Sequence, residues 1–450
     1  MAIVVNTPRF RAKDLVAFPG YAQSGIAWFE YLVGIGAVYF TVGPLLAGLL
    51  PDTGWSLSAV SIAILIRGLL GVLSGPLTGF LIHRFGVRPI VLIGGVSTAA
   101  FTALTGAVTN PVEFALVFGV ALAFADGFMG NIAPATVVHK WFLTRRAGMM
   151  GLVNSGAGFG GMIFAPLMAL LVTQYGWRQA CLILGGIILV STIPALFLKR
   201  GAAESGYGVD GVPGRFIPDT GDKDAVGTPQ QSIKQIAKHP VFWMVFFLFG
   251  IEAWSLGVFA ADQAVFLKEI GIGSVESSVA LGAAAGVAAV SGILLTRISD
   301  RISPYYALIG AFASMLIGAI AFLFAKDITM VWVYSVFFGA GYGLFVPTLP
   351  VAITRYFGAL EVSRALGIGA IVAGIMGGLG PYITARVVDT TGNMTIAIGI
   401  VTAMLGIGLV VAILARPPKY ALKTVKKVDP TETVERTATT GAHLPADVEA

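Results

Sequence analysis

Five ionisable residues interrupt the long apolar stretches of this 450-residue sequence, and these are the positions where the chain could do chemistry. They are one cation and four acids: Arg67, Glu30, Asp126, Glu252 and Asp262. A guanidinium group binds a carboxylate through two parallel hydrogen bonds and keeps its charge throughout the physiological pH range. A carboxyl group can take up and release a proton. The five residues therefore predict a site that handles an organic anion, a proton, or both.

The composition around these residues is that of a membrane protein. Hydrophobic residues make up 56% of the chain and charged residues 12%, whereas a soluble globular chain carries about 25% charged residues. The charged residues are too few to cover the apolar side chains in water, so lipid must be the solvent. The apolar runs are 20 or more residues long and do not alternate. Because backbone groups in lipid must bond internally, such runs predict membrane-spanning helices.

Twelve such helices are expected, in two groups of six. Gly176 marks the connection between two of them, at 147–173 and 178–198. Residues 199–239 contain no apolar run and hold many Gly, Asp and Pro. The predicted organisation is a cytoplasmic arm, a six-helix bundle, a cytoplasmic linker, a second six-helix bundle and a disordered cytoplasmic tail, over residues 1–20, 21–198, 199–239, 240–416 and 417–450.

The distribution of Lys and Arg predicts the orientation of the chain in the membrane. If the N-terminus is inside, 24 of the 29 Lys and Arg residues fall in cytoplasmic connections and tails, 4 fall outside and Arg67 lies within a span. Cytoplasmic loops carry an excess of these residues. We therefore expect a multi-pass protein of the cytoplasmic (inner) membrane with both termini in the cytoplasm. The net charge of +6 then needs no nucleic-acid partner.

The depths of the ionisable residues can be counted along the helices at 1.5 Å per residue. Arg67, Asp126 and Glu252 fall near the middle of the membrane. An ionisable group at that depth is usually paired, hydrated or functional. Arg67 and Asp126 lie at similar depths, so two interpretations stay open. Arg67 binds a substrate anion, or it pairs with Asp126, and both hold if the substrate displaces Asp126.

The acids are candidates for proton coupling. Burial favours the neutral form of a carboxyl group, and a nearby cation favours the charged form. Glu252 has no cation in its own span and is the predicted proton carrier, or else it stays protonated and hydrogen-bonded. Asp126, Asp262 and Glu30 are the further candidates. We expect Glu30 nearer the cytoplasm and Asp262 nearer the outside, where Asp262 could instead be a charge at an outer gate.

One loop carries a recognisable signature. The segment GFLIHRFGVRP, residues 79–89, resembles the inner-loop pattern Gly-x-Leu-x-Asp-Arg-x-Gly-x-Arg of the major facilitator superfamily, with His83 in place of the acid. The equivalent loop of the second half reads RISDRIS. We expect these loops to latch the cytoplasmic ends of the helices, although the arginines could be positive-inside charges alone. The predicted latch residues are Gly79, Arg84, Gly86, Arg88, Asp300 and Arg301.

A longer stretch, residues 140–180, resembles the monocarboxylate porter branch, which includes the oxalate:formate antiporters. It carries Trp141-Phe142, a basic pair, a Gly-rich span and an outer Gly-Trp-Arg in that order. The resemblance implies two pseudo-symmetric six-helix bundles, a monomer, and a central cavity that opens alternately to each side. It also implies that spans 1, 4, 7 and 10 line this cavity. The predicted substrate contacts there, beside Arg67, are Tyr39, Asn131, Trp254 and Tyr342.

The resemblance implies transport of a small organic anion, in particular a monocarboxylate, with proton symport or as an exchange. Carriers of this branch generally place an Arg in the eighth span, whereas residues 278–295 contain no cation here. A proton-coupled carrier of a neutral or cationic solute therefore stays an alternative, and so does a sensor that binds without transport. The sequence has no phosphate-binding loop, metal-ligand spacing or catalytic constellation. We expect no enzyme activity, no cofactor and no metal.

Overall fold

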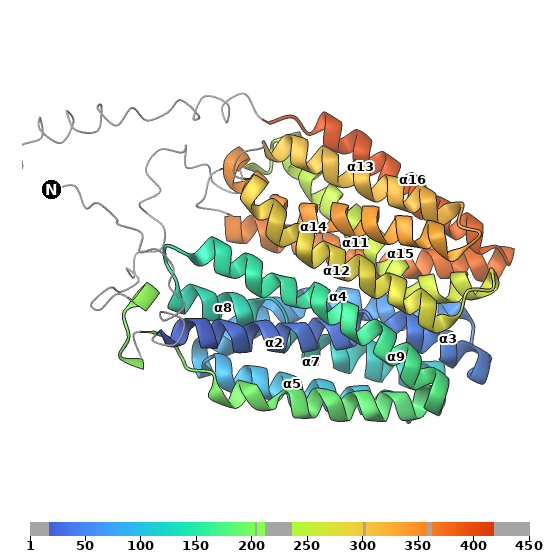
Figure 1. The fold of residues 1–450 in the computed structure, drawn as a ribbon, viewed down its shortest axis with the longest axis horizontal. Coiled ribbons are helices and arrows are strands. Elements are labelled where there is room, and N and C mark those ends of the chain that lie inside the picture. Colours follow the sequence, from blue (N-terminus) through green and yellow to red (C-terminus); the bar gives the residue numbers. More distant parts are fainter. Residues whose placement is uncertain (1–17, 203–204, 212–235, 300–302, 358–361, 418–450) are drawn as a thin grey trace, which may run out of the picture.

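The computed structural model describes residues 18–202, 205–211, 236–299, 303–357 and 362–417. The regular elements in these ranges are helices (Figure 1). Most of the predicted arm, much of the linker and nearly all of the tail lie outside the described residues. The helices are α2 (Pro19–Tyr39), α3 (Val42–Thr53), α4 (Leu57–Phe85), α5 (Val87–Thr105), α6 (Pro111–Phe114), η1 (Ala115–Ala121), α7 (Leu122–Met129), α8 (Ile132–Trp141), α9 (Arg146–Ser191), η2 (Ile193–Phe197), η4 (Val209–Gly211), α11 (Pro240–Glu269), α12 (Ser274–Ser299), α13 (Pro304–Leu323), α14 (Ile328–Phe357), α15 (Val362–Thr391) and α16 (Met394–Leu414).

Eleven segments of the described chain are long and apolar enough to cross a membrane, and one of them contains two spans. Helix α9 breaks at Gly176, where φ is +78° and ψ is 159°. Glycine adopts this backbone conformation without the steric cost that a Cβ atom would bring. Figure 1 shows α9 reversing its direction, so its two limbs run through the bundle in opposite senses. The limbs match the two spans predicted on either side of Gly176. The chain is an all-α membrane protein with twelve spans in its described residues.

Local sequence sets where several helices begin. The Ser56 side chain accepts a hydrogen bond from the backbone nitrogen of Ala59 at 3.3 Å and caps α4. Asn110 caps α6 through the backbone nitrogen of Glu113 at 2.9 Å. Such caps satisfy backbone groups that have no partner inside the helix. The connections before α4 and α6 are therefore short and well defined.

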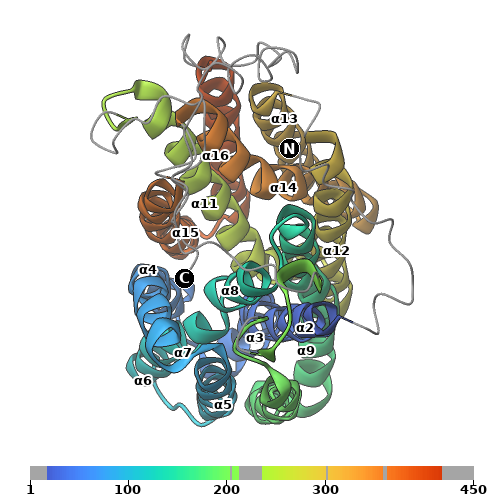
Figure 2. The same cartoon turned by 90° about the vertical axis from the view of Figure 1, so that its left-hand side faces the viewer.

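The N-terminal helices α2 to α9 and the C-terminal helices α11 to α16 form two groups that face each other (Figure 2). We call the end of the bundle that holds Pro19 and Phe85 the Pro19 end, and the opposite end, which holds Thr53 and Leu57, the Thr53 end. Helices α4 and α15 pair across the two groups, and so do α9 and α12.

Small residues bring the two groups into direct contact. A Cβ atom on Gly68 of α4 would lie 2.6 Å from the carbonyl oxygen of Gly374 on α15, and one on Gly158 of α9 would lie 2.8 Å from the Cβ of Ala289 on α12. Small residues allow this close approach in lipid, where packing drives helix association.

A polar contact closes the Thr53 end. The backbone nitrogen of Ser58, in the first turn of α4, donates to Asp389 Oδ2 of α15 at 3.0 Å. This carboxylate lies at the positive end of the α4 dipole, where an anion is stabilised. The two groups therefore touch from the middle of the helices to the Thr53 end.

Small residues also allow a close crossing of α2 and α9 within the N-terminal group, and a substitution there tests the packing. A Cβ atom on Gly36 would collide with the backbone of Gly160. We expect Gly36→Ala to lower the thermal unfolding midpoint in detergent, because overpacking of this kind costs about 1–3 kcal/mol. Gly25→Ala is the matched control, since the same helix has open space around Gly25. Tryptophan fluorescence on heating measures the unfolding midpoint of each variant. Equal midpoints would contradict the close packing of Gly36 against Gly160.

Candidate functional site

A cavity of about 350 Å³ lies between the two groups of helices, lined by residues of α2, α9, α11, α12 and α14, by Phe40 after α2 and by Asn131 before α8. It is mainly apolar with a few polar groups, as small-molecule sites usually are. The polar side chains that line it are Tyr31, Tyr39, Asn131, Asn154, Ser155, Glu252 and Tyr342.

The cavity extends from the middle of the bundle toward the Pro19 end. Gly151 lies in the second turn of α9, and Ile293 and Pro347 lie in the halves of α12 and α14 nearest the Pro19 end. The contacts between Gly68 and Gly374 and between Ser58 and Asp389 close the opposite side. The structure is therefore in a conformation closed at the Thr53 end.

Glu252 is the ionisable residue of the cavity lining. Its side chain is 3% exposed, and it lines the cavity near the middle of α11. No ion pair or hydrogen bond to its carboxyl group occurs within the described residues. Tyr39 and Tyr342 lie within electrostatic range of it. The carboxyl group is thus free to interact with whatever enters the cavity.

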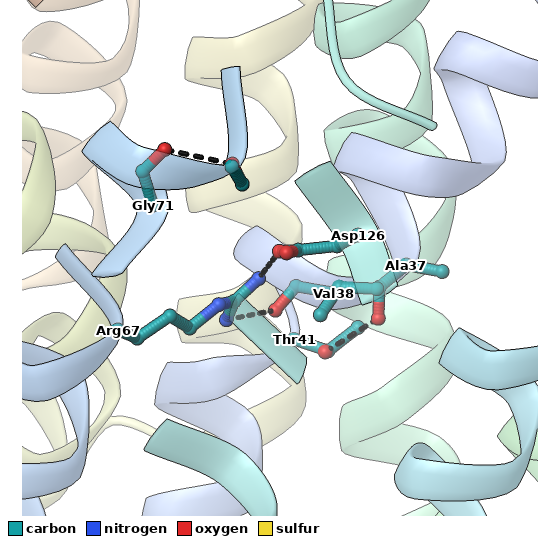
Figure 3. Close-up of polar contacts among 7 residues, drawn as sticks. Ala37, Val38, Thr41, Arg67, Gly71 and Asp126 are labelled. Carbon is teal, nitrogen blue, oxygen red and sulfur yellow. Dashed lines mark hydrogen bonds and ion pairs between the residues drawn. The ribbon is translucent and has the colours of Figure 1, made fainter. Parts of the chain in front are cut away.

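Arg67 and Asp126 form an ion pair between α4 and α7 (Figure 3). Arg67 Nη1 also donates to the carbonyl oxygen of Val38 at 3.3 Å. Val38 lies in the last turn of α2, where carbonyl groups lack partners inside the helix. The guanidinium carbon lies 5.1 Å from the centre of the Phe118 ring, a distance at which a cation is attracted to the ring face. Arg67 is therefore held by three helical segments, α2, η1 and α7.

The fourth span is irregular where it supports this pair. It contains the π-helical turn η1 (Ala115–Ala121), which carries Phe118, followed by α7, which carries Asp126. π-Helical turns are rare and occur frequently at functional sites. The side of the turn facing α4 is closely packed, because a Cβ atom on Gly119 would lie 2.9 Å from the carbonyl oxygen of Ala63.

The similar depths predicted for Arg67 and Asp126 are confirmed by their contact. Arg67 is not among the residues that line the cavity, and its side chain is 13% exposed. Tyr39 lies within electrostatic range of both Arg67 and Glu252. Tyr39 also follows Val38, whose carbonyl oxygen accepts from Arg67, and this places the ion pair next to the cavity lining. Tyr39, Asn131 and Tyr342 line the cavity at positions predicted for substrate contacts.

Three other predicted residues lie away from the cavity. Trp254 packs against α15, since a Cβ atom on Gly380 would lie 3.1 Å from its ring. Asp262 is buried and accepts a hydrogen bond from Thr384 Oγ1 at 2.8 Å, while its other oxygen has no partner in the described residues. Glu30 is buried within the N-terminal group. None of these three residues lines the cavity.

The first predicted latch loop lies at the Pro19 end. Gly86 follows α4 with a φ of +89°, and Arg84 lies 5.5 Å from the ring centre of Phe85. Neither Arg84 nor Arg88 makes an ion pair with any residue that the structure describes. The space around Gly79 is open. The partners predicted in the second half, Asp300 and Arg301, lie outside the described residues, so the latch stays a prediction.

Asn154 and Ser155 of α9 also line the cavity. Ser155 Oγ does pack, since it accepts from Trp28 Nε1 at 3.2 Å and donates to the carbonyl oxygen of Leu152 at 2.6 Å. Asn154 leaves its side-chain oxygen without a hydrogen bond in the described part of the chain. No group of three or more His, Cys, Asp or Glu residues suited to a metal occurs among the described residues.

The sequence model of the Major Facilitator Superfamily matches residues 32–381. The chain belongs to the major facilitator superfamily. Among its curated relatives, monocarboxylate transporter 2 of Mesocricetus auratus is 27% identical over 375 residues, which cover 80% of this chain and 75% of the relative. Monocarboxylate transporter 2 of Homo sapiens is 26% identical over 356 residues, covering 76% of this chain and 72% of the relative.

Solved structures show the same fold. A bacterial homologue of the human lysosomal transporter Spinster, in an inward-facing and unoccupied conformation, superimposes with a TM-score of 0.68 at 15% identity, covering 89% of this chain and 98% of that one. Its inward-facing, occupied form gives 0.66 at 14% identity, covering 88% and 97%. This superfamily member is therefore an integral multi-pass membrane transporter and not an enzyme.

The ion pair generates a stability prediction. Arg67→Gln leaves the Asp126 carboxylate buried without its partner, a change that costs about 3–5 kcal/mol for buried pairs. We expect a clear fall in the unfolding midpoint for Arg67→Gln and for Asp126→Asn alone. The double variant should recover part of the loss, because two neutral amides leave no uncompensated charge. A double variant whose loss equals the sum of the two single losses would contradict the pairing.

Proposed function

We propose that this transporter carries a monocarboxylate together with a proton, by alternating access. The observation that carries the proposal is Glu252, an acid in the central cavity with neither a cation nor a hydrogen-bond partner among the described residues. Tyr39 and Tyr342 lie within electrostatic range of it. The two relatives named monocarboxylate transporter 2 support the choice of substrate.

A shared proton is the proposed basis of coupling. Two carboxylates in contact repel each other in a site of low dielectric constant, and one proton between them removes the repulsion. A protonated Glu252 can donate a hydrogen bond to the substrate carboxylate, and the phenol groups of Tyr39 and Tyr342 can donate others. The anion then binds well only when Glu252 carries a proton. Substrate and proton consequently move in the same direction.

The Arg67–Asp126 pair has a supporting role in this proposal. Its cation lies within electrostatic range of Tyr39. The hydroxyl group of Tyr39 can donate a hydrogen bond to the substrate carboxylate. A guanidinium group never loses its charge in proteins. Arg67 therefore keeps its charge, and a substrate carboxylate that reaches it would displace Asp126 from the pair. Asp262 and Glu30 stay further candidates for proton coupling.

The orientation follows from the distribution of Lys and Arg. We propose that the Pro19 end is cytoplasmic, with both termini inside and the protein in the inner membrane. The described conformation is then open to the cytoplasm. Rocking of the bundle at 21–198 against that at 240–416 would expose the cavity at the other face, and the latch loops would hold the Pro19 end closed. We propose that one chain suffices as a monomer.

A second function has one observation in its favour. Within the part of the chain that the structure describes, the cavity lining includes no Lys or Arg side chain, so a neutral or cationic solute exchanged for protons at Glu252 would meet no like charge there. An organic-anion exchange of the oxalate:formate type would instead proceed without a proton gradient. Both differ from the leading proposal in how flux responds to pH and to substrate charge.

The test is uptake of radiolabelled monocarboxylates into proteoliposomes under an imposed proton gradient. We expect Glu252→Gln to abolish gradient-driven accumulation, because the amide cannot release a proton. It should retain part of the exchange between labelled and unlabelled substrate, since the amide can still donate a hydrogen bond. Glu269→Gln is the matched control, because Glu269 is an exposed acid at the Thr53 end of the same helix.

Three outcomes separate the candidates. Gradient-driven uptake that is lost only in Glu252→Gln supports symport. Uptake by the parent protein that does not depend on the proton gradient indicates organic-anion exchange. Flux of neutral or cationic solutes without any carboxylate flux would overturn the monocarboxylate proposal.

A further inference from the structure

The cavity has a polar region and an apolar wall. Tyr342 lies within electrostatic range of Tyr31, Tyr39 and Glu252, so the four polar groups are clustered. They come from α2, α11 and α14. A carboxylate group at this cluster occupies only one part of the space, and the remaining lining decides what else the substrate can carry.

The apolar wall is built from small residues of α9 and α12. These residues, which we call the small-residue wall, are Ala157, Gly158, Ala288, Ala289 and Gly292. The wall is continuous, because a Cβ atom on Gly158 would lie 2.8 Å from the Cβ of Ala289. No member of the wall has a side chain that can form a hydrogen bond.

Larger apolar side chains flank this wall. Ile35, Phe249, Leu256, Ile293 and Val346 all line the same cavity. Val346 leaves 40% of its surface exposed. A hydrated polar substrate would leave these surfaces in contact with water, whereas an apolar group would cover them. Covering apolar surface contributes roughly 25 cal/mol per Å².

The volume also exceeds the needs of a very small acid. At about 30 Å³ per water molecule, 350 Å³ accommodates roughly a dozen waters. A hydroxy acid of three carbons has six non-hydrogen atoms and would leave about half of this space to water. An acid with an added phenyl-sized group would fill it.

We propose that the preferred substrate is a monocarboxylate with a bulky apolar tail, such as an aryl-substituted or branched-chain acid, whose tail lies on the small-residue wall. The inference rests on the proposed monocarboxylate function and adds the class of acid. The carboxylate lies at Glu252 and the tyrosines, and the tail extends toward α9 and α12. The absence of side-chain bulk at Gly292 and its neighbours provides the room.

The first measurement compares uptake of labelled 3-phenylpropionate and phenylpyruvate with that of acetate and lactate, in the same proteoliposomes and under the same proton gradient. We expect kcat/KM to favour the aryl acids about tenfold or more, the discrimination that one or two extra buried methylene groups give. Uptake of acetate and lactate with no preference for the aryl acids would overturn this inference and leave the proposed function intact. Uptake of no carboxylate at all would overturn the proposed function itself.

The second measurement tests the wall. Among the described residues, a Cβ atom at Gly292 would meet one neighbouring atom within 4 Å, the carbonyl oxygen of Gly343 at 3.3 Å. Gly292→Leu should therefore fill the space meant for the tail and lower the ratio of aryl-acid to acetate uptake about tenfold. Val346→Phe fills the same cavity from α14 and should lower the ratio too, should the first variant fail to fold.

The matched control for these variants is Gly186→Leu. Gly186 has open space around it in the second limb of α9 and is not part of the cavity lining. Its ratio should equal that of the parent protein. An unchanged ratio in both Gly292→Leu and Val346→Phe would show that the tail does not lie on the small-residue wall.

Discussion

A charged side chain in the hydrocarbon layer must find a partner, lose its charge or reach water, and the site described above follows from that requirement. Arg67 and Asp126 satisfy it by pairing, with Val38 and Phe118 as further neighbours. Glu252 satisfies it differently, because it faces a cavity in which its proton can be shared. In this conformation Arg67 and Asp126 are paired, whereas the carboxyl group of Glu252 is available to a substrate.

Close contact between small residues also determines how the two groups of helices pack against each other. Gly68 against Gly374, and Gly158 against Ala289, bring the two groups of helices together at small residues. Shallow surfaces of this kind can separate and meet again at low cost, which a carrier that rocks between two orientations requires. Gly158 also lines the cavity, so a contact that positions the helices shapes the substrate space as well.

The spans, the break at Gly176 and the shared depth of Arg67 and Asp126 could be predicted, because each follows from apolar length, backbone chemistry or helical rise. The rotation of a helix about its own axis could not. Helix α11 is apolar around its whole circumference, so its sequence does not show that Glu252 faces the cavity while Trp254 faces α15. Phe118 was missed for a related reason, since the π-helical turn that carries it changes the helical register. The latch at Asp300 and Arg301, the orientation in the membrane and the domain boundaries remain predictions.

Because of the contact between Asp389 and the start of α4, closure of the Thr53 end depends on the solution on one side of the membrane only. The carboxylate is exposed and holds the Thr53 end shut through a backbone nitrogen of the opposite group. Interactions at exposed charges weaken as dissolved ions accumulate within a Debye length of them. Salt in the solution that bathes the Thr53 end should therefore loosen this closure, whereas salt on the other side cannot reach it.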